Sequence, residues 1–363
     1  MTGAEYKLLF DGTPATKEQL ERFETITVDQ DADRPWQARL ELSVCIDDQG
    51  NWVEDDEPFM QILHRVRVEL RLGEGDCQPL IDGPIVGFDS DRRSAPGQSV
   101  VTVIVHDDSA LLNRDASVVS YSAGLKDSEI ASQIFGDYPE IIGSTEVEPT
   151  PAPPAAQQPE MRRRGTDMQF LRQLAQRNNF ACGVAPGARP SSSIGIFHKR
   201  PVFGDEPPPL VLLGRDRNIE TFDVKLNAHG QSNVVASTLS FSDKSTVTRS
   251  SQVRDLGIAG QQQLAPGSGE TVDLQHRVDS AAERSSRAFE ATGSVRQGCY
   301  SGILVPFHPV TTQLGTTHTS GKYTIEKVTH RLGRSEYTQD FTLVADQLSE
   351  SAAGSSLIPA GLF

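Results

Sequence analysis

Aromatic side chains are scarce in this sequence, at 6% of 363 residues, and long apolar runs are missing. The hydrophobic cores must therefore be built mainly from Val, Ile and Leu. A membrane-spanning helix needs about 18 or more consecutive apolar residues, so we expect no membrane insertion. The N-terminus includes Glu5 and holds no apolar run of signal-peptide length, so we expect no secretory signal.

Cysteine is also scarce. The four cysteines lie far apart and form no CxxC pair, which favours free core thiols over a disulfide framework or a zinc site. Thiols of this kind are typical of a protein made in a reducing cytoplasm. The residues are Cys45, Cys77, Cys182 and Cys299.

Basic residues are in deficit. Lys and Arg total 34 against 49 Asp and Glu, so the net charge is −15. This balance argues against nucleic-acid binding as the main role, because gripping a phosphate backbone requires a basic face. The 30 glycines and 22 prolines predict many turns. The length fits two or three domains.

Familiar catalytic motifs are absent from the sequence. It contains no HExxH, no GxSxG, no P-loop and no GxGxxG after a strand. Asp29, Asp31 and Asp33 resemble the opening of a calcium loop, but the sixth position is Arg34 and the twelfth is Leu40. We therefore assign no catalytic, cofactor-binding or metal-binding residue and predict that the protein is not an enzyme.

Strand-type patterns fill the first 115 residues. Apolar and polar residues alternate without a fault through Trp36–Ile46, and Arg65–Leu72 does the same. Successive side chains of a strand point to opposite faces, so each segment has one packed face and one face at solvent or an interface. Val100–Val105 is β-branched nearly throughout and predicts a more fully buried strand.

The pattern changes in the middle of the chain. Leu125–Phe135 predicts a short helix. A Pro-rich stretch at 149–159 predicts a semi-extended linker, because proline fixes φ and donates no hydrogen bond. Thr166 and Gln169 form a capping box, which predicts a helix over Asp167–Asn178.

Strands are expected again toward the C-terminus. Val278–Ala291 predicts a helix, and Ile303–Phe307, Tyr323–His330 and Tyr337–Ala345 predict strands. The patterns divide the chain into a first β domain at 1–115, an α+β domain at 116–205, a discontinuous second β domain at 206–241 and 296–347, a loop–helix insertion at 242–295 and a flexible tail at 348–363.

A weak internal repeat links the two β regions. In the first, Gly83 is followed by strand patterns and by Asp107, 24 positions later; in the second, Gly321 is followed by Asp346, 25 positions later. This spacing is consistent with one antiparallel unit used twice. It is equally consistent with two unrelated three-stranded meanders.

Three ordered motifs carry a family resemblance. An acidic, Phe-Leu, Leu-Ala helix runs into an aromatic strand, and a later strand reads Gly-x-Tyr-x-Ile-x-x-Val-x-His; between residues 103 and 112 a strand runs into an Asp and a Leu pair. The set resembles the baseplate hub family, which comprises phage late control protein D and the N-terminal hub half of VgrG. The first two motifs lie at Asp167, Phe170, Leu171, Leu174, Ala175, Phe180, Gly321, Tyr323, Ile325, Val328 and His330.

The resemblance implies a β-dominated α+β fold, with two related tube-type β-barrel domains and α/β insertions between them. It also implies a homotrimeric ring, a symmetry adaptor that joins a trimeric spike to a hexameric inner tube and contacts baseplate wedge proteins. Such a protein is made in the bacterial cytoplasm and becomes part of a virion or a contractile injection system. Only 17 residues follow Asp346, so we expect the spike to be a separate polypeptide.

Two alternatives from other classes stay open at the level of sequence. A tail-associated, β-rich cell-wall glycan hydrolase would need a carboxylate pair or a metal set in a cleft. A glycan-binding β-sandwich would usually present exposed Trp or Tyr, and this chain has 2 Trp and 6 Tyr. The negative charge predicts either an acidic channel lining or a surface that meets a basic partner.

Overall fold

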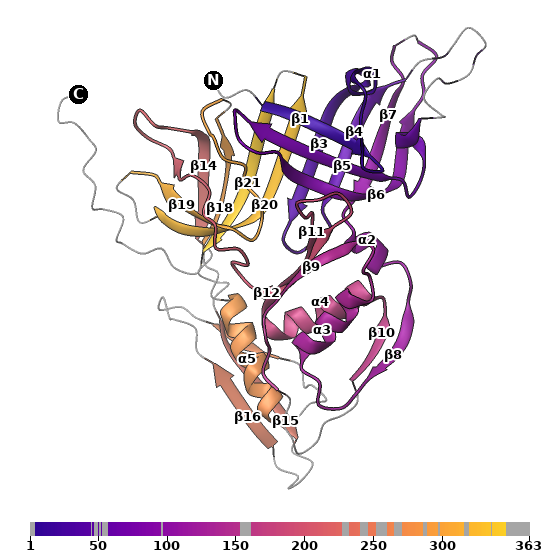
Figure 1. Cartoon of the computed structure of the whole chain (residues 1–363). Coiled ribbons are helices and arrows are strands. Elements are labelled where there is room, and N and C mark those ends of the chain that lie inside the picture. Colours follow the sequence, from indigo (N-terminus) through magenta and orange to yellow (C-terminus); the bar gives the residue numbers. More distant parts are fainter. Residues whose placement is uncertain are drawn as a thin grey trace, which may run out of the picture.

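A computed structural model describes residues 4–44, 46, 50, 52, 57–95, 97–152, 161–226, 232–239, 246–251, 260–264, 271–285, 289–296, 298–315, 319–334 and 336–345. The fold is β-dominated with few helices, as predicted (Figure 1). The predicted tail at 348–363, Asp346 and most of the Pro-rich stretch lie outside the described residues.

A 13-stranded sheet forms the upper part of the molecule in Figure 1. Its strand order is β14-β18-β21-β20-β3-β4-β7-β6-β5-β1-β2, and β19 and β13 extend from the edge of β20. The strands of its N-terminal half are β1 (Ala4–Phe10), β2 (Thr13–Pro14), β3 (Phe23–Asp31), β4 (Gln37–Ser43), β5 (Arg65–Leu72), β6 (Gln78–Asp91) and β7 (Val100–His106). Those of its C-terminal half are β13 (Leu210–Val211), β14 (Ile219–Leu226), β18 (Phe289–Val295), β19 (Pro309–Gln313), β20 (Gly321–Gly333) and β21 (Tyr337–Ala345).

The two halves follow the same strand plan. The order β3-β4-β7-β6-β5 in the first half corresponds to β14-β18-β21-β20-β19 in the second. Bulges also match: Glu24 and Glu220 are the extra residues of β3 and β14, and Val86 and Glu326 are those of β6 and β20. Because bulges fix local register, these shared positions support a duplicated unit.

The bulges also correct the alignment suggested by spacing. They pair Ile85 with Ile325, since both lie directly before the extra residue. Gly83 then corresponds to Tyr323 rather than to Gly321, a shift of two positions. Gly83 has its own reason to lack a side chain, because an added Cβ would lie 2.0 Å from the carbonyl oxygen of His106.

The halves join through a main-chain seam. The C-terminal part of β20, from Lys327 to Gly333, pairs antiparallel with β3, from Asp31 back to Thr25. The two expected barrels are therefore one continuous sheet, and the strand order of the described residues is open rather than closed into a ring.

Side-chain alternation places the core as expected. In β4, Ala38, Leu40 and Leu42 are fully buried, whereas Arg39 and Glu41 are exposed. The strand ends at Ser43, earlier than the predicted Ile46. Ile46 is 53% exposed and forms only an isolated bridge with Trp52.

An α+β unit lies below the first half of the sheet (Figure 1). Its helix α4 occupies the predicted span and begins with the predicted capping box of Thr166 and Gln169. Helices α3 and α4 cover a sheet of order β11-β12-β9. The elements are α2 (Ser109–Leu112), β8 (Ser117–Tyr121), α3 (Asp127–Gly136), β9 (Ile142–Val147), β10 (Met161–Gly165), α4 (Asp167–Asn178), β11 (Phe180–Ala185) and β12 (Ser193–Lys199).

A third, small unit lies at the lower end of Figure 1. Helix α5 packs its apolar stripe on a sheet of order β16-β15-β17, around Leu274 and Val278. Strands therefore occur where a polar loop was expected after Ser242. The unit contains β15 (Ser232–Leu239), β16 (Thr246–Ser251), β17 (Gly260–Gln263) and α5 (Thr271–Ser285).

Two element predictions in the C-terminal part were wrong. The predicted helix over Val278–Ala291 ends at Ser285, and Phe289 already belongs to β18 in the large sheet. The apolar run Ile303–Phe307 is irregular, and the strand at this place is Pro309–Gln313. The remaining short helices are α1 (Lys17–Arg22) and a 3-10 turn at Pro58–Met60.

Candidate functional site: the polar face of the shared sheet

The resemblance-bearing residues of α4 and β11 serve packing. Asp167, Phe170, Leu171, Leu174 and Ala175 are buried in the α+β unit, and Phe180 is half-buried against the same core. The ring of Phe170 stacks on Tyr121 with centroids 5.7 Å apart.

Asp167 has a polar role in this core. It accepts a hydrogen bond from the Tyr138 hydroxyl at 2.7 Å and forms an ion pair with Arg163. Its place in the first turn of α4 also lets the carboxylate interact with the positive end of the helix dipole.

The resemblance-bearing residues of β20 lie elsewhere, in the large sheet. Gly321, Tyr323, Ile325, Val328 and His330 are all buried. The Tyr323 hydroxyl donates to the carbonyl of Thr319 at 2.8 Å. The two motifs thus support two separate cores.

His330 belongs to a buried polar relay across the seam. Its Nε2 lies 3.2 Å from Oε1 of Gln30, whose amide nitrogen donates to the carbonyl of Leu80 at 2.7 Å. Its Nδ1 lies 2.9 Å from the Tyr337 hydroxyl. Because Oε1 can only accept, Nε2 carries the proton and Nδ1 accepts from Tyr337.

Burial keeps this histidine neutral. Desolvation lowers the pKa of His330 to about 3, so the imidazole is uncharged near neutral pH. The relay therefore joins β21, β20, β3 and the start of β6 without burying a charge. Sequence analysis singled out His330 but had no signal for its partners, because Gln30 is 300 positions away.

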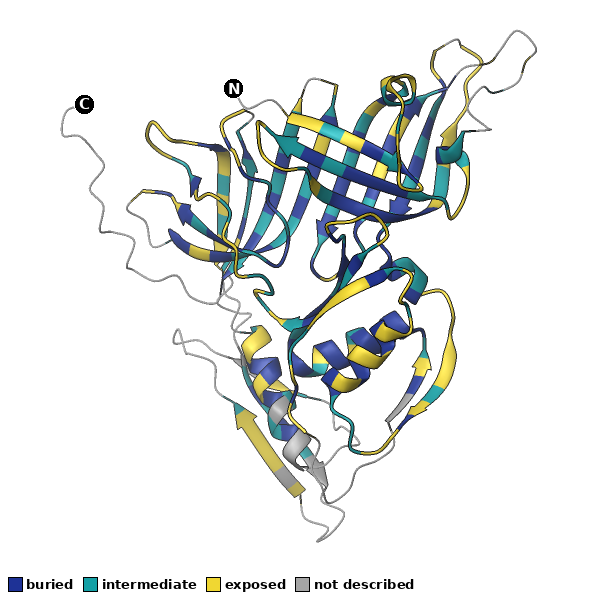
Figure 2. Ribbon diagram, in the orientation of Figure 1, coloured by how far each residue is buried: buried dark blue, intermediate teal, exposed yellow. Residues whose placement is uncertain are grey.

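The opposite face of the shared sheet is polar across both halves. In one cross-strand row, Thr221, Ser294, Asp340, Thr329 and Asp29 are successive neighbours. Figure 2 shows exposed and half-buried residues alternating with buried ones along these strands. Threonine recurs throughout the face, at Thr25, Thr27, Thr102, Thr221, Thr292, Thr329, Thr338 and Thr342.

Charged groups on this face are mostly acidic and partly paired. Arg331 pairs with Asp340, and the Thr329 hydroxyl donates to Asp29 at 2.6 Å. The acidic members of the rows are Asp29, Asp31, Glu41, Asp89, Asp91, Asp223, Glu290 and Asp340. The basic members are Arg39, Lys225, Lys327 and Arg331.

A buried ion-pair cluster fixes the α+β unit to the first half. Arg67 of β5 is 2% exposed; its Nη1 donates to Asp82 at 3.0 Å and to the carbonyl of Gly187 at 2.9 Å. Arg65 pairs with Asp82 at 2.9 Å and with Asp108 at 2.5 Å. We call Arg65, Arg67, Asp82 and Asp108 the arginine clamp.

The clamp corrects the expectation for β5. Alternation placed Arg65 and Arg67 on a solvent or interface face, and that face is covered by the turn between β11 and β12. Burial raises the pKa of Asp108 although Arg65 opposes the shift. Next to it, Asp107 accepts from the backbone of Trp36 at 2.6 Å and of Ser109 at 2.9 Å, and burial raises its pKa to about 7.

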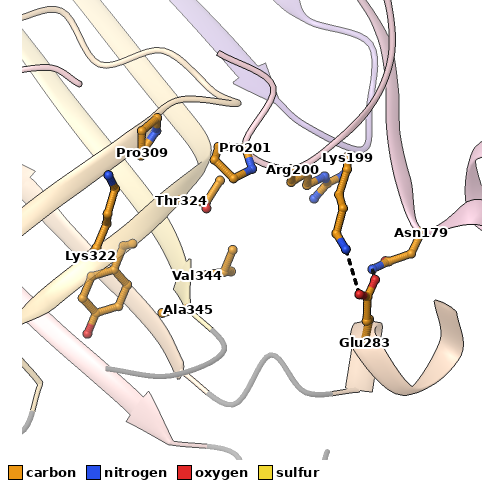
Figure 3. Close-up of a pocket in the computed structure, with 11 residues that line it drawn as sticks. Asn179, Lys199, Arg200, Pro201, Glu283, Pro309, Lys322, Thr324, Val344 and Ala345 are labelled. Atoms are coloured by element: carbon orange, nitrogen blue, oxygen red, sulfur yellow. Dashed lines mark hydrogen bonds and ion pairs between the residues drawn. The ribbon is translucent and has the colours of Figure 1, made fainter. Parts of the chain in front are cut away.

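A pocket of about 500 Å³ lies where the three units meet (Figure 3). The two lysines that line it form ion pairs with carboxylates: Lys199 contacts Glu283 at 2.8 Å, and Lys322 contacts Glu206 at 3.3 Å. Asn179, the residue after α4, donates to Glu283 at 3.0 Å. The pocket therefore lies at a junction held by ion pairs.

Over the described ranges, no three His, Cys, Asp or Glu side chains gather as a metal site. The calcium-like run forms a turn in which Asp31 accepts from the backbone of Asp33 at 2.9 Å. None of the described helices has the length and apolarity to cross a bilayer.

The whole described architecture matches solved structures. A tail protein from Neisseria meningitidis superposes with a TM-score of 0.68 at 13% identity, covering 96% of this chain and 98% of that one. The chain has the fold of phage tail proteins. A 43 kDa prophage MuSo2 tail protein from Shewanella oneidensis matches at a TM-score of 0.64 and 11% identity, over 94% and 98% of the two chains.

The fold also extends to secretion-system proteins. An Escherichia coli type VI secretion component, described as similar to the T4 tail proteins gp27 and gp5, matches at a TM-score of 0.57 and 14% identity. That match covers 93% of this chain and 76% of the other. No protein-family profile and no curated protein sequence matches this chain.

Proposed function

We propose that this chain is the structural baseplate hub of a contractile phage tail or of a related contractile injection system. In this role it is a homotrimer that joins a separate trimeric spike to the hexameric inner tube, next to baseplate wedge proteins. The duplicated half-sheet carries the proposal. Two equivalent units in each chain give six in a trimer, which is the number a hexameric tube requires.

The polar face of the sheet is proposed to line the channel of this hub. Threonines and mostly acidic side chains make up most of the described wall, beside a few apolar members such as Ile104 and Val344, so it offers a passing polymer little apolar surface to which it could adhere. Its negative charge also repels polyanions. This use would account for part of the net charge of −15.

The role is structural rather than catalytic. The residues that carry the family resemblance support the two cores. We propose a division into a first β domain, an α+β domain and a second β domain that is interrupted by an insertion. The insertion holds β15 to α5 rather than 242–295, because β15 packs with α5 and β18 belongs to the large sheet. The particle that contains the protein is a virion or an injection apparatus. Its fold relatives include tail proteins and a type VI secretion component.

Light scattering on the purified chain tests this function. We expect a trimer that binds the spike and tube proteins encoded by neighbouring reading frames. A monomer that binds neither protein would contradict the hub role. As a matched activity control, purified peptidoglycan should remain undigested, which separates the hub from the glycan hydrolase alternative.

A further inference from the structure

The two halves of the sheet share one corner, at the irregular segment that leads into β5 or β19. Leu63 in the first half is equivalent to Phe307 in the second, and both have a positive φ, 68° and 73°. Each donates its N–H to the carbonyl of the residue before the bulge, at 2.9 and 3.0 Å. A histidine follows each of them, His64 and His308, and its carbonyl accepts the N–H of that same residue at 2.8 and 2.9 Å. The corner therefore has one main-chain geometry in both halves.

A segment from the same chain covers the corner of the second half. We call this segment, Arg200–Phe203 between β12 and β13, the strap. Val202 and Phe203 donate their main-chain N–H groups to the carbonyl of Phe307, at 2.9 and 3.3 Å. The Phe203 ring stacks on the His308 imidazole, with centroids 4.8 Å apart. The strap therefore satisfies the carbonyl and covers the histidine.

An ion pair anchors the first residue of the strap. Arg200 has a side chain that is 8% exposed, and it contacts Glu326, the bulge residue of β20, at 2.5 Å. Arg200 also contacts Asp33 at 2.5 Å. Arg200 and Pro201 line the pocket of Figure 3. The charge at the start of the strap thus matches an acidic bulge residue.

The corner of the first half has no such cover among the residues the structure describes. The carbonyl of Leu63 accepts no hydrogen bond from them. The Leu63 side chain is 58% exposed, whereas that of Phe307 is 2% exposed. The His64 side chain is 39% exposed, and its Nδ1 lies 2.6 Å from a carboxylate oxygen of Asp11. A backbone acceptor and an imidazole are therefore presented at the surface.

Apolar side chains surround this acceptor. Ile62 is 51% exposed, and Val86, the bulge residue equivalent to Glu326, is 38% exposed. Apolar groups gathered at exposed positions commonly mark interaction surfaces. We call Ile62, Leu63, His64 and Val86 the open corner.

We propose that the open corner binds an extended segment of a partner protein in the manner of the strap. An aromatic side chain of the segment stacks on His64, and an apolar side chain three positions earlier packs on Val86. The N–H groups of the aromatic residue and of the residue before it donate to the Leu63 carbonyl. The partner is a protein other than this chain, because each copy already uses its strap on its own second half. The site lies beyond the hub role, since neither spike nor tube is needed to form it.

The bulge residue sets the preference at the first position of the segment. Glu326 pairs with a cation, whereas Val86 offers no charge to an incoming arginine. A cation that loses water against an apolar group without a partner is disfavoured, and an apolar side chain gains from the same contact. The open corner should therefore select an apolar residue where the strap has Arg200.

Fluorescence anisotropy with short labelled peptides and the full chain tests the site. The first probe is Leu-Pro-Val-Phe-Gly, which is the strap sequence with its arginine replaced by leucine. Replacing its Phe by Ala should weaken binding about tenfold, because the stacking partner of His64 is lost. The Arg-Pro-Val-Phe-Gly peptide should bind about fivefold more weakly than the leucine peptide.

Variants of the chain locate the binding and change its preference. Leu63→Asp should abolish binding of the leucine peptide, whereas Val118→Asp, at an exposed apolar position of β8, should leave it unchanged. Val86→Glu recreates the acidic bulge residue of the second half. We expect it to reverse the preference, so that the arginine peptide binds about fivefold more tightly than the leucine peptide.

The outcomes separate this site from other uses of the corner. Binding that is lost in Leu63→Asp and reversed in Val86→Glu supports the proposal. Absent binding, or binding that persists in Leu63→Asp, overturns it. The corner could instead contact a second copy of the chain; a lower mass of Leu63→Asp in light scattering, without peptide binding, would show this and overturn the proposal. Spike and tube binding by the unmodified chain tests the hub role separately, so that role stands if the peptides fail.

Discussion

In the first half of the sheet, Leu40 of β4 lies opposite Val103, whereas the equivalent pair in the second half is Gly293 and Phe341. An added Cβ on Gly293 would lie 2.6 Å from the Phe341 ring and 2.3 Å from the carbonyl of Thr221. A small residue thus faces a large one, where the first half has two of middle size. The comparison teaches that the shared plan is kept by strand register and bulges, while each core is filled by its own combination of side chains.

The halves also differ in what they hold. Arg65 and Arg67 of β5 clamp the α+β unit, whereas the equivalent β19 positions are Pro309 and Thr311. The relay through His330 has no counterpart either, because the equivalent β6 residue is the exposed Ser90. The two equivalent half-sheets therefore make different contacts. The first holds the α+β unit, and the second contains the relay through His330.

The largest expected effect comes from removing the clamp of the first half. Arg67→Ala leaves Asp82 buried without one of its two arginines, and we expect a loss of about 4 kcal/mol in the free energy of unfolding. Urea denaturation measures it. The matched control is Arg71→Ala on the same strand, whose exposed pair with Glu5 should contribute far less to the free energy of unfolding. Equal effects would contradict the distinction.

Truncation of Phe307, which packs at the seam, should lower the free energy of unfolding by nearly as much. Phe307→Ala empties a buried site against Trp36, and we expect a loss of about 3 kcal/mol. Val118→Ala, at an exposed position of β8, should change stability by less than about 0.5 kcal/mol. A Phe307 variant as stable as the Val118 variant would show that the halves do not depend on this contact.

Gly293→Ala tests the difference in core filling. The new methyl group meets backbone and a buried ring, so we expect a loss of about 2 kcal/mol by overpacking. Gly87→Ala is the control, because its added Cβ meets no atom within 4 Å. Thermal unfolding of the two variants should separate them, and similar midpoints would argue against tight packing at Gly293.

We expect the free energy of unfolding to depend on pH through His330, which lies in the second half of the sheet. The folded pKa of His330, about 3, lies below the ordinary value of 6.5, so the unfolded chain binds the proton more readily. The stabilisation is complete above pH 6.5 and is lost as pH falls toward 3, with a slope of at most about 1.4 kcal/mol per pH unit. Denaturation midpoints across this range should show a shallower slope in His330→Gln, and an unchanged slope would exclude the relay.

Local patterns predicted the individual elements well. The capping box fixed the start of α4, and alternation identified the buried face of β4 around Leu40. These features depend on neighbours in the chain, which the sequence displays directly. The resemblance-bearing residues lie in helix α4 and strands β11 and β20.

Long-range features could not be predicted in the same way. Alternation showed that Arg67 lies on a polar face but not that a turn 120 residues later covers it. The spacing argument missed the bulges at Val86 and Glu326, which insert a residue without a mark in the sequence. The apolar run before Pro309 satisfied strand propensity, yet Pro306 and the left-handed Phe307 make it irregular.

The seam between β3 and β20 has a consequence for assembly by mass action. Both strands belong to one chain, so this joint forms during folding and does not weaken on dilution. In the proposed trimer, only the contacts between chains respond to protein concentration. The contact that closes the ring forms between chains that are already held together, so the effective concentration of its two sides is high. Assembly should therefore rise steeply with protein concentration.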